Sequence, residues 1–273
     1  MFLLGSAYPT AKLGLNASIP PILFGSLRMA IVFICLLPFL NFKLPNKKYL
    51  LPLFGFGISM GMSVNLFLYL SVNASNILSP IVIGAQLSIP IAIIISSIFI
   101  GENISKKKWI LIITSFLGIL LIAFDPKIAD EILGFLLICC MAFFYASAQV
   151  FSRYLKELDV KFTNACMGGI GFISLLILSI YFEGNTITHL KQLNIDAWLL
   201  ALYHGVLCSL MGHMSMFYLY KFYPVGQVLP FYALFPVFGI LLSFFIFGEI
   251  PTLIMVIGGI IVITSVFLLQ KIR

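Results

Sequence analysis

Two stretches with one pattern decide the fold of this chain: PIAIIISSIFIGE at residues 90–102 and PVFGILLSFFIFGE at residues 236–249. In each stretch a proline opens an apolar run that ends in Gly-Glu, and a second apolar run follows. The two prolines are 146 residues apart in the chain, and the two glutamates are 147 apart. A fixed spacing of this size indicates that the chain consists of two similar halves.

The composition of the chain places it in a lipid bilayer. Of its 273 residues, 62% are hydrophobic and 9% are charged, and the mean hydropathy is +1.14. A soluble domain is about 45–50% apolar and about 25% charged. These values exclude a water-soluble enzyme, a nucleic-acid-binding domain and a disordered protein. The five cysteines lie in apolar runs and follow no metal-binding spacing, so we expect no disulfide framework and no metal site.

Apolar runs separated by polar residues predict ten membrane-spanning helices, since a span needs about 20 apolar residues. The runs lie at residues 2–16, 20–40, 50–71, 77–100, 108–124, 131–152, 163–182, 197–220, 225–247 and 251–270. The first run is short and opens at Met1 without a polar lead. We therefore expect a truncated first helix and a natural start farther upstream. Ten helices divide into two five-helix repeats, residues 1–125 and residues 126–273.

The basic residues predict how the helices cross the membrane. The net charge is +7, and 12 of the 16 Lys and Arg residues lie in alternate connections. Cytoplasmic connections carry such an excess of Lys and Arg. We therefore expect an integral protein of a bacterial cytoplasmic (inner) membrane, with its carboxy terminus in the cytoplasm. An odd number of helices per repeat inverts the second repeat relative to the first, which is an architecture of secondary transporters.

Several short motifs along the chain form a set: Gly5-Ser6 with Lys12, Arg28, Gly101-Glu102, Gly248-Glu249, Gly258-Gly259 and the stretch from Tyr220 to Ile263. With this set the chain resembles the EamA branch of the drug/metabolite transporter superfamily over nearly its whole length. The resemblance implies ten helices in two inverted halves around a central cavity, and movement of small metabolites. Leu4 departs from the family's pattern, in which a tryptophan often precedes the glycine. The regions of His213 and Tyr220 are also similar to S-adenosylmethionine uptake carriers and amino-acid exporters.

Polar residues inside a bilayer span are costly and are therefore candidates for substrate contact. Gln86 lies in the fourth run, and the repeat spacing pairs it with Tyr232 in the ninth. The same spacing brings Asn65 of the third run close to His213 of the eighth. We expect these four side chains to line a cavity, where the imidazole of His213 can contact substrate or carry a coupling proton. The alternative for each is a hydrogen bond between helices, worth about 0.6 kcal/mol in membranes.

Three further residues are candidates for the same cavity. Tyr145 and Gln149 are four residues apart and share a helix face. Arg28 lies inside the second run, where a buried cation can bind either a substrate carboxylate or free backbone carbonyls. His204 lies closer to the outer end of its run, and we expect it at the membrane interface. Glu249 and its repeat partner follow glycines at helix ends, where we expect each to cap the next helix.

The chemical groups that are missing also bear on function. None of the nine Asp and Glu residues lies in the middle of a run, and the sequence has no phosphate-binding loop, HExxH or GxSxG motif. Because these are the groups that carry catalysis in common enzyme classes, we expect neither an enzyme nor a bound cofactor.

The expected function is secondary transport of a small polar or zwitterionic organic metabolite by alternating access. Amino acids and nucleoside-like compounds such as S-adenosylmethionine suit an apolar cavity with scattered amide, hydroxyl and imidazole groups. The alternatives are a non-transporting or degenerate membrane scaffold and, with less support, a membrane-embedded enzyme. The expected partners are the small-molecule substrate, the lipid bilayer and, as a further option, a second copy in a homodimer, with no nucleic acid.

Overall fold

The computed structural model describes residues 1–40, 45–101, 103–213, 215 and 234–271, and over these ranges it is helical, with no β-strand. The α-helices are α1 (Phe2–Asn16), α2 (Pro21–Leu36), α3 (Leu50–Phe56), α4 (Val64–Asn73), α5 (Ser79–Gly84), α6 (Ser88–Ile100), α7 (Lys106–Ala123), α8 (Ile132–Tyr154), α9 (Val160–Phe182), α10 (Thr186–Gln192), α11 (Ile195–Leu202), α14 (Phe235–Phe247) and α15 (Leu253–Lys271). Shorter segments are the 3-10 turns η1 (Leu37–Phe39), η2 (Lys47–Tyr49), η4 (Ala85–Leu87) and η5 (Pro126–Glu131), and the π-helical segments η3 (Gly57–Ser63) and η6 (Tyr203–His213).

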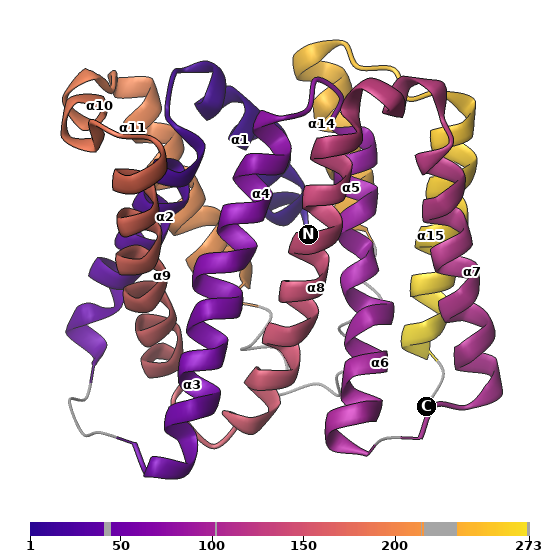
Figure 1. Cartoon of the computed structure of the whole chain (residues 1–273), viewed down its shortest axis with the longest axis horizontal. Coiled ribbons are helices and arrows are strands. Elements are labelled where there is room, and N and C mark those ends of the chain that lie inside the picture. The colour runs from indigo at the N-terminus through magenta and orange to yellow at the C-terminus, as the bar shows by residue number, and fades with distance from the viewer. Residues whose placement is uncertain (41–44, 102, 214, 216–233, 272–273) are drawn as a thin grey trace.

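Each of the ten predicted spans contains a described helix. Four of these spans are composite: α2 and η1 follow one another in the second, α3, η3 and α4 in the third, α5, η4 and α6 in the fourth, and α11 and η6 in the eighth. Six described helical segments are long and apolar enough to cross a membrane, and α2 and α14 are shorter apolar helices. Helix α10, in the connection between the seventh and eighth spans, was not predicted. Figure 1 shows the spans side by side, with Met1 about midway along the bundle.

The two repeated stretches form helices that begin and end alike. Pro90 and Pro236 both lie in the first turn of a helix, α6 and α14 respectively, where no backbone hydrogen bond is lost. Both helices end at a glycine in the left-handed region, with φ of 76° at Gly101 and 68° at Gly248. Residues with a side chain rarely adopt this conformation, so the Gly of each Gly-Glu pair ends its helix.

The helices pack as two inverted halves around a pseudo-twofold axis. Helix α2 packs along α9, and α7 packs along α15, so the second and fifth spans of one half meet their equivalents in the other. Helix α1 packs on α14 as α8 packs on α6. Near the axis, Ser26 Oγ donates to the carbonyl of Phe172, 146 residues later, over 3.4 Å. Between α7 and α15, Gly118 and Gly258 allow the two backbones to approach closely, as small residues do in membrane helix pairs.

The two ends of the bundle carry opposite charge. At the lower end in Figure 1, which we call the basic end, lie Lys47, Lys48, Lys106, Lys107, Lys108, Arg153, Lys156, Lys161 and Lys271, with Glu157 and Asp159. At the upper end, which we call the acidic end, lie Asp125, Asp130, Glu131, Glu183, Asp196 and Glu249, with Lys12, Lys127 and Lys191. The expected alternation of basic connections therefore corresponds to one face of the described bundle.

Two carboxylates join separate helices at the acidic end. Glu183, after α9, accepts hydrogen bonds from two backbone N–H groups in the first turn of α2, over 2.6 and 2.9 Å. Glu249, after α14, accepts two from the start of α5, both over 2.8 Å. A negative charge is favourable at a helix N-terminus. The prediction that Glu249 caps the next helix was wrong: the capped helix belongs to the other half. Glu102 lies outside the described residues.

Candidate functional site

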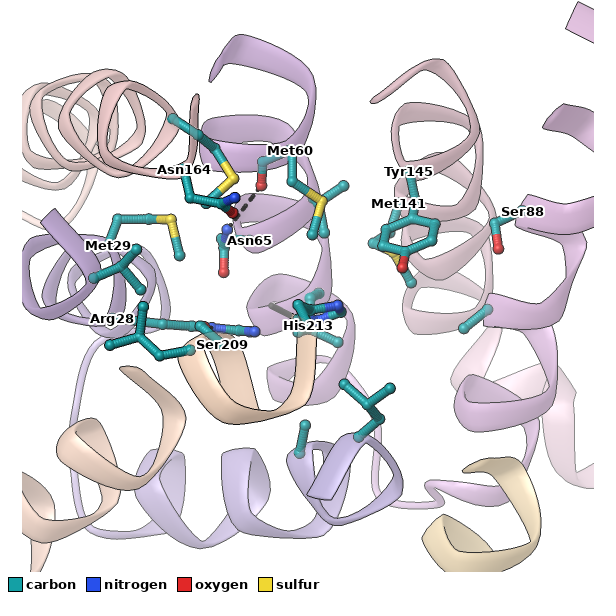
Figure 2. Close-up of a pocket in the computed structure, with 18 of the residues that line it drawn as sticks. Arg28, Met29, Met60, Asn65, Ser88, Met141, Tyr145, Asn164, Ser209 and His213 are labelled. Atoms are coloured by element: carbon teal, nitrogen blue, oxygen red, sulfur yellow. Dashed lines mark hydrogen bonds between the residues drawn. The ribbon is translucent and has the colours of Figure 1, made fainter. Parts of the chain in front are cut away.

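A pocket lies between the two halves, in the interior of the bundle (Figure 2). Its walls come from α1, α2, α3, η3, α4, η4 and α6 of the first half and from α8, α9, η6 and α14 of the second. The space between these walls is about 860 Å³, a figure that includes open solvent. Most lining side chains are apolar, with a few polar groups among them, which is the composition of a small-molecule site.

Four of the predicted site residues line this pocket: Arg28, Asn65, Tyr145 and His213. They come from four different spans, the second, third, sixth and eighth. Figure 2 shows Arg28 reaching toward His213, with Asn65 close to both. The fold therefore brings together side chains from both halves that are far apart in the sequence.

The other three predicted site residues do not line it. Gln86 is fully buried in η4, between two lining residues, and neither atom of its amide group has a partner among the described residues. A buried polar group without a partner costs about 1–3 kcal/mol. Gln149 lies half-buried on α8, one turn beyond Tyr145 toward the basic end. Tyr232 lies outside the described residues.

Arg28 brings a buried positive charge to the pocket wall. The residue is only 5% exposed. Its side chain reaches from α2 to η6, where Nε donates to Ser209 Oγ over 2.8 Å. Ser209 Oγ donates in turn to the carbonyl of His204, five residues earlier, over 3.0 Å. No carboxylate of the described ranges forms an ion pair with Arg28. Because a buried charge normally has a counter-charge, its guanidinium can bind an anion in the pocket.

Two asparagines bring hydrogen-bond acceptors to a second wall. Asn65 Nδ2 donates to the carbonyls of Met60 and Gly61, over 3.1 and 2.9 Å. Its Oδ1 is buried and has no partner in the described structure. Asn164 Nδ2 likewise donates to the carbonyl of Val160 over 2.8 Å. Asn65 Nδ2 uses both of its N–H bonds on its own span, so its oxygen is the atom that can serve a ligand, and the Asn164 amide carries a second carbonyl-type oxygen.

The remaining lining is aromatic and sulfur-rich. The rings of Tyr145 and His213 lie 6.3 Å apart, centroid to centroid. Tyr8 stacks on Phe235 with a centroid distance of 6.0 Å. Four methionines also line the pocket: Met29, Met60, Met141 and Met167. Methionine is flexible and polarisable, so this lining can adapt to apolar groups of different shape.

A buried layer of rings, which we call the aromatic layer, lies beside the pocket and consists of Phe24, Tyr69 and His204. The rings of Phe24 and Tyr69 stack at 4.5 Å. His204 Nδ1 shares a hydrogen bond with the Tyr69 hydroxyl, and Nε2 shares one with Thr10 Oγ1, each over 2.9 Å. All three rings are 0% exposed. The prediction that His204 is interfacial was therefore wrong, because its two nitrogens are bonded inside the bundle.

The aromatic layer lies between the pocket and the acidic end. Phe24 lies one turn closer to that end than Arg28 on α2, and Tyr69 lies one turn closer than Asn65 on α4. His204 likewise lies closer to the acidic end than the lining residues of η6. The aromatic layer therefore comes from three spans, two from the first half and one from the second.

Sequence reasoning missed several of these residues. Asn164 is a polar residue in an apolar run, which is the signal that identified Asn65, so it could have been predicted in the same way. Ser209 carries no such signal, because serine is common in membrane helices and its partner Arg28 is 181 residues away. Within the described ranges, no three His, Cys, Asp or Glu side chains gather closely enough to hold a metal ion.

Comparison with known proteins agrees with this architecture. The profile of the EamA-like transporter family matches residues 1–124 and 132–270. An uncharacterized transporter of Bacillus subtilis (strain 168), YdfC, is 28% identical over 162 residues, which cover 58% of this chain and 51% of that protein. The match thus spans about half the length of this relative. One solved crystal structure superposes over 99% of this chain and 97% of its own, with a TM-score of 0.56 and 16% identity, and shares the fold alone.

Proposed function

Because the chain belongs to the EamA-like transporter family, we propose that it is a secondary transporter that moves a small polar or zwitterionic organic metabolite by alternating access. The observation that carries this proposal is the pocket, whose walls come from both halves and which has the aromatic layer between it and the acidic end. Transporters with inverted repeats bind substrate where their halves meet and expose that site to each side in turn.

Opening toward the acidic end requires the aromatic layer to separate. Its bonds join the third and eighth spans, which are equivalent in the two halves, so a movement of one half against the other breaks them. Gln86 supports a second conformation, because no described residue pairs with its buried amide in this one. In the other conformation we expect that amide to gain a partner or to reach the pocket.

The lining favours organic substrates over multiply charged ones. Only one fixed charge, that of Arg28, faces the pocket among the described lining residues. We therefore propose amino acids and nucleoside-like compounds such as S-adenosylmethionine as the substrate classes. Because cytoplasmic connections are rich in Lys and Arg, we place the basic end, with the carboxy terminus, on the cytoplasmic side of a bacterial inner membrane.

Exchange in proteoliposomes tests the proposal. The purified chain is reconstituted with unlabelled compound inside, and labelled S-adenosylmethionine, aromatic amino acids or aliphatic amino acids are added outside. We expect saturable exchange of one class, absent from protein-free vesicles. Absence of exchange for every class would contradict the proposed substrates and favour a non-transporting membrane scaffold.

A further inference from the structure

We infer that the pocket recognises a zwitterion with an apolar side chain, whose carboxylate binds Arg28 and whose ammonium group donates to Asn65 and Asn164. This inference rests on the proposed function, because it names the substrate chemistry of the same pocket. It follows from the opposite polarity of the two walls, one carrying a cation and the other carrying acceptor oxygens.

The wall of Arg28 is suited to one carboxylate. The guanidinium is buried, and Nε is held by Ser209, which fixes the plane of the group. The Tyr69 hydroxyl also bonds to the guanidinium, and the remaining N–H bonds can serve a ligand. Arginine binds carboxylates through two parallel hydrogen bonds. A second fixed cation is missing from the lining of the described pocket, so a phosphate or a dicarboxylate would keep an unbalanced charge in an apolar site.

The wall of Asn65 and Asn164 is suited to a donor. Asn65 Oδ1 is buried, and no described group donates to it. The amide cannot turn round to present its nitrogen, because Nδ2 is held by the carbonyls of Met60 and Gly61. An ammonium group has three N–H donors and no acceptor, so it complements a wall of carbonyl-type oxygens.

The rest of the ligand faces apolar side chains. The four lining methionines, the rings of Phe56 and Phe235 and several aliphatic side chains outnumber the polar groups of the remaining lining, which include Ser88, Tyr145 and His213. A polar ligand side chain would lose its hydration against the apolar part of this surface, at a cost in binding free energy. An amino acid with an aromatic or aliphatic side chain meets all three conditions.

Three compounds with the same phenyl ring test the two charged groups of such a ligand one at a time. L-Phenylalanine carries both groups, 3-phenylpropionate carries only the carboxylate, and 2-phenylethylamine carries only the ammonium group. The chain has three arginines, so replacing Arg153→Lys and Arg273→Lys leaves Arg28 as the single target for phenylglyoxal. Mass spectrometry then gives the rate at which Arg28 is modified in the purified full chain. We expect L-phenylalanine and 3-phenylpropionate to slow this modification at least threefold, and 2-phenylethylamine to leave it unchanged.

The acceptor wall is tested by Asn65→Leu and, should that variant fold poorly, by Asn164→Leu. Either change should weaken protection by L-phenylalanine at least threefold while leaving protection by 3-phenylpropionate, which lacks the ammonium group, within twofold. A merely structural role would weaken both equally. Equal weakening, protection by 2-phenylethylamine or protection by none of the three compounds would overturn the inference.

Failure of the inference and failure of the proposed function give different results, because the protection assay needs no transport. Exchange of a compound without a carboxylate, at a rate that Arg28→Gln leaves unchanged, would retain the transporter and overturn the inference. Protection in the expected order without any exchange would retain the recognition site and contradict transport.

Discussion

The two π-helical segments make the most informative comparison in this molecule. η3 and η6 lie in the third span of their respective halves, and their first residues, Gly57 and Tyr203, are separated by the repeat spacing of 146. In each segment a side chain satisfies an otherwise free carbonyl: Asn65 bonds to the carbonyls of Met60 and Gly61 within η3, and Ser209 bonds to a carbonyl within η6. The backbone irregularity is therefore shared by both halves.

The chemistry at the two segments differs. Beside η3, Asn65 presents an acceptor oxygen, whereas in η6 Ser209 holds the cation of Arg28. π-Helical turns occur frequently at functional sites, since they redirect side chains and free backbone groups. The comparison shows how duplicated halves can keep one backbone device while their polar residues diverge, which gives a symmetric fold an asymmetric pocket.

The largest expected effect comes from the same substitution in both segments. Gly61→Ala places a Cβ 2.4 Å from the carbonyl oxygen of Met167 and 3.1 Å from Gly171 Cα, both backbone atoms of α9. Backbone atoms cannot turn aside, so we expect destabilisation by about 1–3 kcal/mol. The measurement is thermal unfolding of the purified protein in detergent.

Gly212→Ala in η6 is the matched control for packing. Its Cβ meets the tip of the Leu4 side chain at 3.0 Å, which a change of rotamer relieves. We expect a small change in melting temperature. An equal decrease in melting temperature for the two variants would mean that η3 and η6 are packed alike, which would contradict the expected difference between them.

The second prediction concerns the two serines matched by the repeat spacing. Ser209→Ala removes the acceptor of Arg28 Nε, and a hydrogen bond to a charged group is worth about 1.5–3 kcal/mol. We expect the concentration of L-phenylalanine that half-protects Arg28 from phenylglyoxal to rise at least tenfold. Ser63→Ala in η3 should change it less than twofold, because Ser63 bonds to no charged group in the described structure. Similar shifts for both would remove the distinction between the segments.

The smallest expected effect concerns the bond that joins the two spans. Tyr69→Phe removes the hydroxyl that bonds to His204 Nδ1 in the aromatic layer, and a neutral hydrogen bond is worth about 0.5–1.5 kcal/mol. Because the proposed opening toward the acidic end breaks this bond, we expect roughly a twofold to tenfold increase in labelling of a cysteine at Ser88 by an impermeant thiol reagent from that side. A decrease would show that the layer does not close the pocket.

Much of the fold was predictable, because it depends on strong local patterns. The spans follow from apolar runs, and the repeat follows from Pro90, Pro236 and the two Gly-Glu pairs. The π-helical segments were not predictable, since GISMGMS at residues 57–63 reads as an ordinary apolar helix. Helix α10 escaped detection because a seven-residue helix in a polar connection has no clear hydrophobic period.

The site was predictable only where a polar side chain stands out in an apolar run. Arg28, Asn65, Tyr145 and His213 meet that condition and line the pocket, although their contact with substrate stays a prediction. Burial of His204 could not be foreseen, because it depends on partners 194 and 135 residues away. The placement of Gln86 behind the pocket wall depends on how η4 turns within its span, which repeat spacing alone does not determine.

Labelling of Ser88→Cys from both faces of a sealed vesicle tests alternating access most directly. Ser88 lines the pocket, and the five natural cysteines are first replaced. Our account predicts that an impermeant thiol reagent labels this position from either face, and that L-phenylalanine changes the two rates in opposite directions. Labelling from one face alone under every condition, or two rates that fall together, would contradict it.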